Sequence, residues 1–192
     1  MAKETTVADY MRLAKANVTI AREFELFKSR IFNYTLKWEG VFDIKKGGQL
    51  HNVAGDSGGW TLWGIAYNHN KGVFKDFADF KDTTYEEAAA IAYIRYYRSI
   101  QAFILPEEAR LMYFDIAYNM GISRAIKLMQ ECAGVKADGV IGPVTREKMV
   151  NVTEECLYQK RNTTYYTLVK ANRDLNKFLK GWLARSSSIF KI

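Results

Sequence analysis

The sequence contains little proline and little cysteine, with two residues of each among 192. So few prolines, together with 48% apolar and 14% aromatic residues, exclude disordered, collagen-like and proline-rich proteins. Cys132 and Cys156 are too few for a disulfide framework, and neither belongs to a Cys-x-x-Cys motif or a Cys/His cluster. We therefore expect two reduced thiols that pack as small core residues, and no structural zinc or other metal site.

Long hydrophobic runs are also absent. Nowhere do roughly 18 uncharged apolar residues follow one another, and the first residues, Met-Ala-Lys-Glu-Thr-Thr-Val, contain no apolar signal segment. The sequence therefore predicts neither a transmembrane segment nor a signal peptide. We expect a protein that is made in a cytosol and does not leave it by the general secretory route unaided.

The charge is predominantly positive and is concentrated near the two ends. The 28 basic and 21 acidic residues give a net charge of +7. Residues 1–38 hold 7 basic and 4 acidic residues, residues 39–143 hold 11 and 13, and residues 144–192 hold 10 and 4. Basic ends attract polyanions such as nucleic acid, anionic lipid or bacterial wall polymers. The sign of the charge therefore restricts the class of partner to polyanions but does not identify which one.

Apolar residues recur every three or four positions over most of the chain, a pattern typical of amphipathic helices. The first such pattern covers residues 5–38, with one break expected near Asn17, and its simplest use is packing against the main body. A glycine-rich stretch, 40–72, predicts loops with one small hairpin. Thr84–Glu87 then forms a capping box that opens a helix toward Ile100. Later helices are predicted from Pro106 to Gly121, from Ser123 to Gly134, after Pro143 and from about Thr153.

Glu39 ends the first helical pattern, in the segment Leu36-Lys37-Trp38-Glu39-Gly40-Val41-Phe42. Glycoside hydrolysis needs a carboxylic acid that stays protonated near neutral pH beside the scissile oxygen. Leu36, Trp38 and Phe42 could form an apolar pocket that disfavours the ionised carboxylate. The simpler interpretation is a solvated carboxylate at a helix end.

Asp56 and Thr61 lie in the following segment, 55–65, which reads Gly-Asp-Ser-Gly-Gly-Trp-Thr-Leu-Trp-Gly-Ile. An aspartate before a pair of glycines is typical of an ordinary turn, and the alternation from Trp60 to Ile65 is typical of a half-buried strand. In the functional interpretation, the Thr61 hydroxyl orients a water molecule. The Asp56 carboxylate then activates that water or stabilises positive charge on a sugar ring.

Together these segments resemble the glycoside hydrolase family 108 N-acetylmuramidases, found among phage endolysins and related bacterial wall hydrolases. The family's Glu-Gly-Gly-Tyr motif corresponds to Glu39-Gly40-Val41-Phe42, which departs from it at Val41 and Phe42. The family's Asp-x-Gly-Gly-x-Thr-x-x-Gly-Ile motif is complete from Asp56 to Ile65. The resemblance implies Glu39 as the catalytic acid, with Asp56 and Thr61 as contributors, and no metal or organic cofactor.

The resemblance continues downstream and covers about residues 32–188. Phe114–Gly121 is similar to the family's Phe-Asp-x-Ala-x-Asn-x-Gly helix, Ala133–Thr145 to its Asp-Gly-x-Ile-Gly-Pro element, and Lys177–Arg185 to its Phe-x-x-Gly-Trp-x-x-Arg ending. Asp115 and Asn119, four positions apart on one helical face, could hydrogen-bond an N-acetyl sugar, or they could brace neighbouring turns. Asp138–Gly139 is predicted to be a turn that stabilises its loop.

The predicted fold is mainly α (α+β, lysozyme-like), a helical bundle with a small glycine-rich β-hairpin region near the catalytic acid. We expect an amphipathic helical extension over 1–30 and a catalytic region over 31–125. A helical half with a peptidoglycan-binding-like element, 126–192, is expected to pack into the same domain.

The leading functional hypothesis is a lysozyme-type peptidoglycan hydrolase, a monomer that cleaves the β-1,4 bond between N-acetylmuramic acid and N-acetylglucosamine. The resemblance implies a phage endolysin that stays in the host cytoplasm until release and then acts on the wall. The alternatives are a non-catalytic peptidoglycan-binding module or a bacterial wall-remodelling enzyme. A nucleic-acid partner is not expected, because no known motif accompanies the basic ends. The helix in residues 1–30 could also contact anionic envelope lipid.

Overall fold

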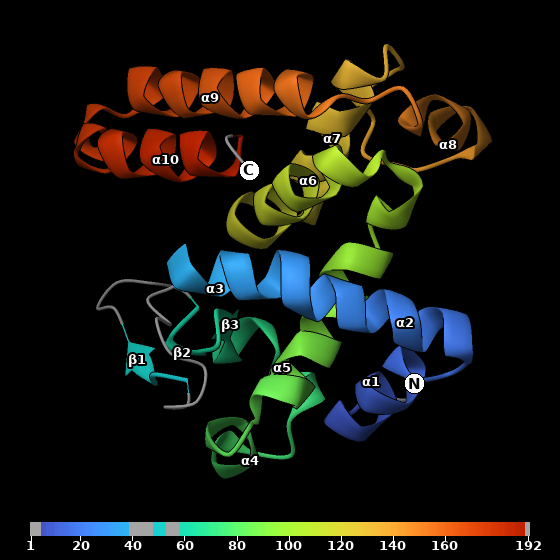
Figure 1. The fold of residues 1–192 in the computed structure, drawn as a ribbon. Coiled ribbons are helices and arrows are strands. Elements are labelled where there is room, and N and C mark those ends of the chain that lie inside the picture. Colours follow the sequence, from blue (N-terminus) through green and yellow to red (C-terminus); the bar gives the residue numbers. More distant parts are fainter. Residues whose placement is uncertain (1–4, 39–47, 53–57, 191–192) are drawn as a thin grey trace. The chain divides into compact units, whose positions relative to one another are not determined.

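The computed structural model describes residues 5–38, 48–52 and 58–190. The chain divides into two compact units, residues 1–95 and 96–192 (Figure 1). The boundary follows Arg95, inside the stretch 31–125 that the sequence assigns to one catalytic region. The strand that carries Thr61 and the helix that carries Asp115 and Asn119 therefore belong to different units.

The first unit opens with a nearly continuous helical run. Thr6 and Asp9 form a capping box, in which the Thr6 hydroxyl accepts from the Asp9 N–H at 3.3 Å and the Asp9 carboxylate accepts from the Thr6 N–H at 3.2 Å. The predicted break near Asn17 is confirmed, because its side chain accepts from the Ile20 N–H and caps a new helix. The run consists of α1 (Val7–Ala14), α2 (Val18–Leu26), the π-helical segment Phe27–Phe32 and α3 (Asn33–Trp38).

The apolar side of this run is used within the first unit. Helix α1 buries Tyr10 and packs against α5 (Tyr85–Ala92), which opens with the predicted capping box. The rings of Phe24 and Phe27 lie 5.3 and 5.4 Å from the ring of Tyr93, centroid to centroid. Packing against the main body is thus observed for this segment, and its contact with anionic lipid stays a prediction.

A small antiparallel sheet lies between α3 and α5 in the sequence. Its strands are β1 (His51–Asn52), β2 (Trp60–Leu62) and β3 (Ile65–Ala66), in the order β1-β2-β3. The sequence predicts one hairpin, which β2 and β3 form, and the structure adds β1 at the other edge of β2. The 3-10 turns Tyr67–His69 and Lys71–Val73 then lead to α4 (Phe77–Lys81).

In its described residues, the second unit has helices as its regular elements, joined by turns and loops. A π-helical segment, Tyr93–Arg98, crosses into it from the first unit, and a 3-10 turn, Ala102–Ile104, follows. The helices are α6 (Glu107–Met120), α7 (Ile122–Cys132), α8 (Pro143–Met149), α9 (Glu154–Ala171) and, after a 3-10 turn at Arg173–Leu175, α10 (Asn176–Ile189). Helices α9 and α10 run side by side as an antiparallel hairpin (Figure 1).

The predicted helix boundaries in this unit hold to within two residues, and the sequence predicts none for α10. Gly121 ends α6 with a φ of +92°, a conformation that glycine adopts without strain, and Pro143 is the first residue of α8. The Thr153 hydroxyl accepts from the Cys156 N–H and so caps α9. Pro106 is the N-cap of α6 and not its first helical residue.

The expectation of two reduced thiols is wrong, because Cys132 and Cys156 form a disulfide, with their Cα atoms 5.8 Å apart. The bond joins the end of α7 to the start of α9, across 24 positions of sequence. It forms because the chain folds back through α8 and brings two helix ends together. That return is a tertiary event, and the cysteine count alone gives no sign of it.

We expect reduction of this disulfide, or the double change Cys132→Ser/Cys156→Ser, to lower the free energy of unfolding by about 3 kcal/mol, because the closed loop restricts the unfolded chain. Urea unfolding with and without dithiothreitol measures the loss. The double-serine variant is the control and should not respond to dithiothreitol. An unchanged midpoint for the parent, with two free thiols detected, would contradict the expectation.

Candidate active site

Three of the five predicted site residues lie in described parts of the chain: Thr61 in the first unit, and Asp115 and Asn119 in the second. Glu39 and Asp56 lie outside the described residues. Helix α3 ends at Trp38, directly before Glu39, with Leu36 fully buried and Trp38 39% exposed. The apolar pocket around Glu39 stays a prediction.

Thr61 is the central residue of β2, the middle strand of the sheet. It pairs with His51 on β1 and with Ala66 on β3, and directly paired residues share one face of a sheet. This face is the more open one, because Leu62 and Ile65 on the other face are buried. Within the described part of the chain, no hydrogen bond engages the Thr61 hydroxyl, so it is available to a water molecule or a sugar.

The glycine pair before β2 positions this strand. Gly59 has a φ of +66°, and a Cβ placed on it would lie 2.6 Å from the side-chain nitrogen of Asn68. The backbone N–H of Asn68 donates to the Gly58 carbonyl at 3.1 Å. A side chain at position 59 would therefore disturb both the backbone and its contact with Asn68. The local geometry explains why the motif has glycine two residues before Thr61.

A buried tryptophan stabilises the turn after β2. Trp63 and Gly64 have φ values of +54° and +76°, the combination that a two-residue type I′ hairpin requires. Trp63 is 4% exposed, and its indole N–H donates to the Thr83 carbonyl at 2.9 Å. A Cβ on Gly48 would lie 2.6 Å from the Trp63 ring. Close packing and one buried hydrogen bond hold a strained residue two positions from Thr61.

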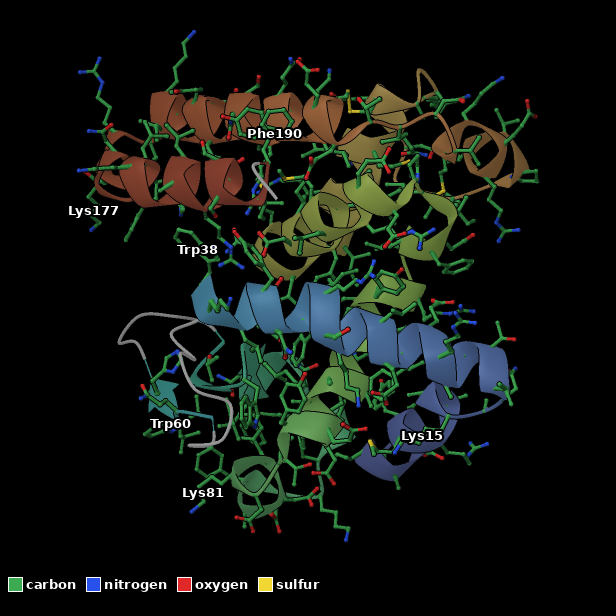
Figure 2. The ribbon with its side chains drawn as sticks, viewed as in Figure 1. Lys15, Trp38, Trp60, Lys81, Lys177 and Phe190 are labelled. Atoms are coloured by element: carbon green, nitrogen blue, oxygen red, sulfur yellow. A yellow bond between two sulfur atoms is a disulfide. The ribbon has the colours of Figure 1, made fainter. Side chains whose placement is uncertain are left out.

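Trp60 and His51 are candidate site residues that the sequence analysis does not single out. Trp60 is 41% exposed on β2 (Figure 2), and its ring contacts Phe77 at 5.9 Å between centroids. His51 is exposed and lies directly across from Thr61. Because side chains alternate along a strand, the Trp60 ring lies on the face of β2 opposite to Thr61 and His51. Exposed aromatic faces suit sugar rings. The alternation from Trp60 to Ile65 could have indicated the faces, but not that the tryptophan is exposed.

Asp115 occupies a buried ionic cluster in the second unit. It is fully buried on α6, and one carboxylate oxygen lies 2.7 Å from a guanidinium nitrogen of Arg161 on α9. Arg185 on α10 approaches the same carboxylate with two nitrogens, at 2.7 and 3.0 Å. Burial opposes ionisation of Asp115, but the charges of Arg161 and Arg185 outweigh it and hold the pKa of its carboxyl below the usual value. This geometry supports the bracing interpretation of Asp115.

Asn119 lies at the exposed end of the same network. Arg161 donates through Nε to the Tyr165 hydroxyl at 2.9 Å, and that hydroxyl donates to the Asn119 side-chain oxygen at 3.4 Å. Asn119 is exposed, whereas Arg161 and Tyr165 are buried. A sugar could therefore reach Asn119 directly. Asp115 contributes only indirectly, because it holds Arg161, which in turn positions the Tyr165 hydroxyl beside Asn119.

The Asp138–Gly139 turn stabilises its loop, as predicted. Gln130, 1% exposed, donates from its side-chain nitrogen to the Asp138 carboxylate at 2.8 Å and accepts from the Gly139 N–H at 2.8 Å. This hydrogen bond from Gln130, with a second from the Val140 N–H, lowers the pKa of Asp138. Gly139 has a φ of +83°, which the turn requires.

Neither a membrane span nor a metal centre is found in the parts of the chain that the structure describes. None of the described helices combines the length and the apolar character that crossing a bilayer requires. No three histidine, cysteine, aspartate or glutamate side chains among those residues come together as metal ligands would.

The architecture, mainly α with one small antiparallel sheet, is that of a lysozyme-like fold. Residues 32–121 match the family described as glycosyl hydrolase 108, and residues 124–187 match a predicted peptidoglycan domain. The chain therefore contains a glycosyl hydrolase 108 region, followed by a region that matches a peptidoglycan domain. The two matches together support a glycoside hydrolase that acts on peptidoglycan, with peptidoglycan as its partner.

The solved structure of SagA from Brucella abortus is similar in fold. It is 24% identical in sequence, with a TM-score of 0.62, and the match covers 82% of this chain and 91% of that chain. A comparison with curated proteins finds no match.

We expect Gly59→Ala to lower the free energy of unfolding by about 1 to 3 kcal/mol and to reduce hydrolysis, because alanine is strained at this φ. Gly181→Ala in α10 is the control, since Gly181 has an ordinary φ and nothing lies within 4 Å of its added Cβ. That change should stabilise the helix by about 0.5 to 1 kcal/mol. Urea unfolding of both variants checks the contrast, and equal stabilities would refute the role of Gly59.

We expect Asp115→Asn to cost about 3 to 5 kcal/mol at neutral pH, because it leaves two buried guanidinium groups without a counter-charge. The lowered pKa means that the carboxylate contributes stability above its unfolded-state pKa and loses that contribution as the pH falls through the folded-state pKa. The urea midpoint of the parent should therefore fall on acidification more steeply than that of the variant. Asp174→Asn, at an exposed position, is the control, and a loss as large there would contradict the assignment.

Proposed function

We propose that the protein is an N-acetylmuramidase of the lysozyme type, which cleaves the β-1,4 bond between N-acetylmuramic acid and N-acetylglucosamine in peptidoglycan. The observation that carries this proposal is the placement of Thr61. Its hydroxyl lies on the more open face of the sheet and has no hydrogen-bond partner among the described residues, on a strand held by Gly59 and Trp63. The glycosyl hydrolase 108 match, 32–121, contains Glu39, Asp56 and Thr61 together.

In the proposed mechanism, Glu39 is the general acid. Its carboxyl proton passes to the glycosidic oxygen as the bond from that oxygen to the muramic acid C1 breaks, so N-acetylglucosamine leaves with a neutral hydroxyl. A water molecule held by Thr61 and Asp56 adds to C1 and gives up a proton to the Asp56 carboxylate. Trp60, in the first unit, is proposed to contact a sugar through its exposed ring. Asn119, in the second unit, is proposed as a separate sugar contact through its side-chain amide.

The proposed setting is that of a phage endolysin, stored in the host cytoplasm and released onto the wall by a separate membrane lesion. The disulfide supports action outside a cytosol, in this setting and in the bacterial alternative alike, because such bonds persist in oxidising compartments and are rare in a cytosol. The cysteines would then be reduced during storage and paired after release. In a bacterial wall-remodelling enzyme with its own export route, the cysteines would also pair after export. The two settings are distinguished by whether the protein acts in phage lysis of a host or in the wall of the cell that makes it.

A non-catalytic peptidoglycan-binding module is the competing proposal. The match of residues 124–187 to a peptidoglycan domain would be its basis. It leaves unexplained why the hydrolase family match includes an unengaged hydroxyl on an open sheet face. Release of soluble fragments from purified sacculi separates a hydrolase from a binder.

We expect Glu39→Gln to reduce the release of muropeptides from sacculi by about 10²- to 10⁴-fold, because glutamine cannot donate the proton that the leaving oxygen needs. Mass analysis of the products should show muramic acid at the new reducing ends. Glu147→Gln, at an exposed position in α8, is the control and should retain the parent rate. A normally folded Glu39→Gln protein with the parent rate would refute the assignment of the acid, and glucosamine at the reducing ends would refute muramidase specificity.

A further inference from the structure

The turn between α9 and α10 carries a cluster of positive charge, which we call the hairpin tip. Lys170, Arg173, Lys177 and Lys180 are all exposed there, with Asp174 as the acidic residue among them. Figure 2 shows Lys177 at this end of the hairpin. No ion pair joins any of the four cations to an acidic side chain in the described chain.

Local stability does not explain this cluster. Lys170, in the last turn of α9, is favoured by the negative end of the helix dipole. Lys177 and Lys180 lie at the start of α10, where the dipole is positive and cations are disfavoured. The first turn of α10 contains no acidic residue that would offset them. Lys28, in the first unit, shows the contrast, because it is paired with Glu86 at 2.8 Å.

Two of the four cations line a recess, and a third, Lys177, lies over the exposed ring of Phe178, 5.1 Å from its centroid. A pocket of about 370 Å³ is lined by Val169, Lys170, Arg173 and Asn176, and so combines two cations with a side-chain amide. Phe178 is 47% exposed, and its ring lies 5.8 Å from that of Trp182, centroid to centroid. A recess with fixed positive charge and an amide suits a carboxylate, and the ring faces suit the adjoining carbon chain or sugar.

We propose that the hairpin tip binds the carboxylates of peptidoglycan peptides. This inference rests on the proposed function in taking peptidoglycan as the partner, and it assigns the contact to particular residues of the region 124–187 that matches a peptidoglycan domain. The cations hold the carboxylates, and the hydrolase unit provides the chemistry.

An anionic bilayer is the other surface with suitable charge, and two features disfavour it. The exposed residues of the turn itself, 171–174, include no large apolar side chain that could enter a bilayer. A recess also suits discrete anionic groups better than a flat charged surface does.

The test measures binding of the Glu39→Gln protein to purified sacculi, so that digestion does not disturb the equilibrium. Adding Lys170→Gln/Lys177→Gln should weaken binding by roughly three- to tenfold, and should reduce its dependence on salt concentration. The matched control is Lys75→Gln/Lys81→Gln, which removes the same charge from two exposed lysines of the first unit. The control should bind as the Glu39→Gln protein does.

Two further probes identify the ligand. Sacculi whose carboxylates have been converted to amides should bind the Glu39→Gln protein, the tip variant and the control variant equally weakly. Vesicles of phosphatidylglycerol and phosphatidylcholine should not distinguish the tip variant from the control. Equal binding of tip and control variants to intact sacculi, undiminished binding to amidated sacculi, or a tip-dependent binding to vesicles would each overturn the inference.

The outcome is separable from that of the proposed function. If the parent releases no muropeptides but binding to sacculi depends on the tip, the hydrolase proposal fails and this inference stands. If the parent releases muropeptides but the tip substitutions leave binding to sacculi unchanged, the hydrolase proposal stands and this inference fails.

Discussion

The arrangement of the second unit depends on one buried carboxylate. Asp115 lies on α6 and forms ion pairs with Arg161 on α9 and Arg185 on α10, so a single carboxylate joins three helices. Removing any partner would leave a charge in a core that cannot solvate it. The surplus positive charge is accommodated by neutral acceptors, the Tyr165 hydroxyl and the Met112 sulfur, which both receive N–H groups from Arg161. The ion pairs therefore restrict how α6, α9 and α10 pack against one another. The same restriction fixes the position of Asn119 on the surface of α6.

The features that could be predicted are those that depend on residues close together in the sequence. The caps at Thr84, Gly121 and Thr153 involve partners within a few positions, and the predicted helices begin and end there. The partners of Asp115 lie 46 and 70 positions away, and those of the disulfide lie 24 positions apart. Such pairings depend on how helices return toward one another, which composition and periodicity do not encode. The sequence therefore predicted the helices well and the contacts between them poorly.

For the candidate site, the motif identified Thr61, and the structure supplies reasons for the residues around it. Gly59 avoids a clash with Asn68, and Gly48 leaves room for the Trp63 ring. The exposure of Trp60 beside Thr61 could not be predicted, because alternation assigns residues to faces without saying where a face meets solvent. The roles of Glu39 and Asp56 rest on the family motif, which names them by spacing alone.

The disulfide has a topological consequence. With Cys132 joined to Cys156, the backbone between them becomes a covalent ring that contains the Asp138 turn and α8. A single broken peptide bond anywhere in that ring leaves α7 and α9 connected through sulfur. The ring contains three basic residues, all exposed, after which trypsin-like proteases would cut: Lys136, Arg146 and Lys148. In the oxidised state the chain can thus be opened at such a bond while its two ends stay on one molecule.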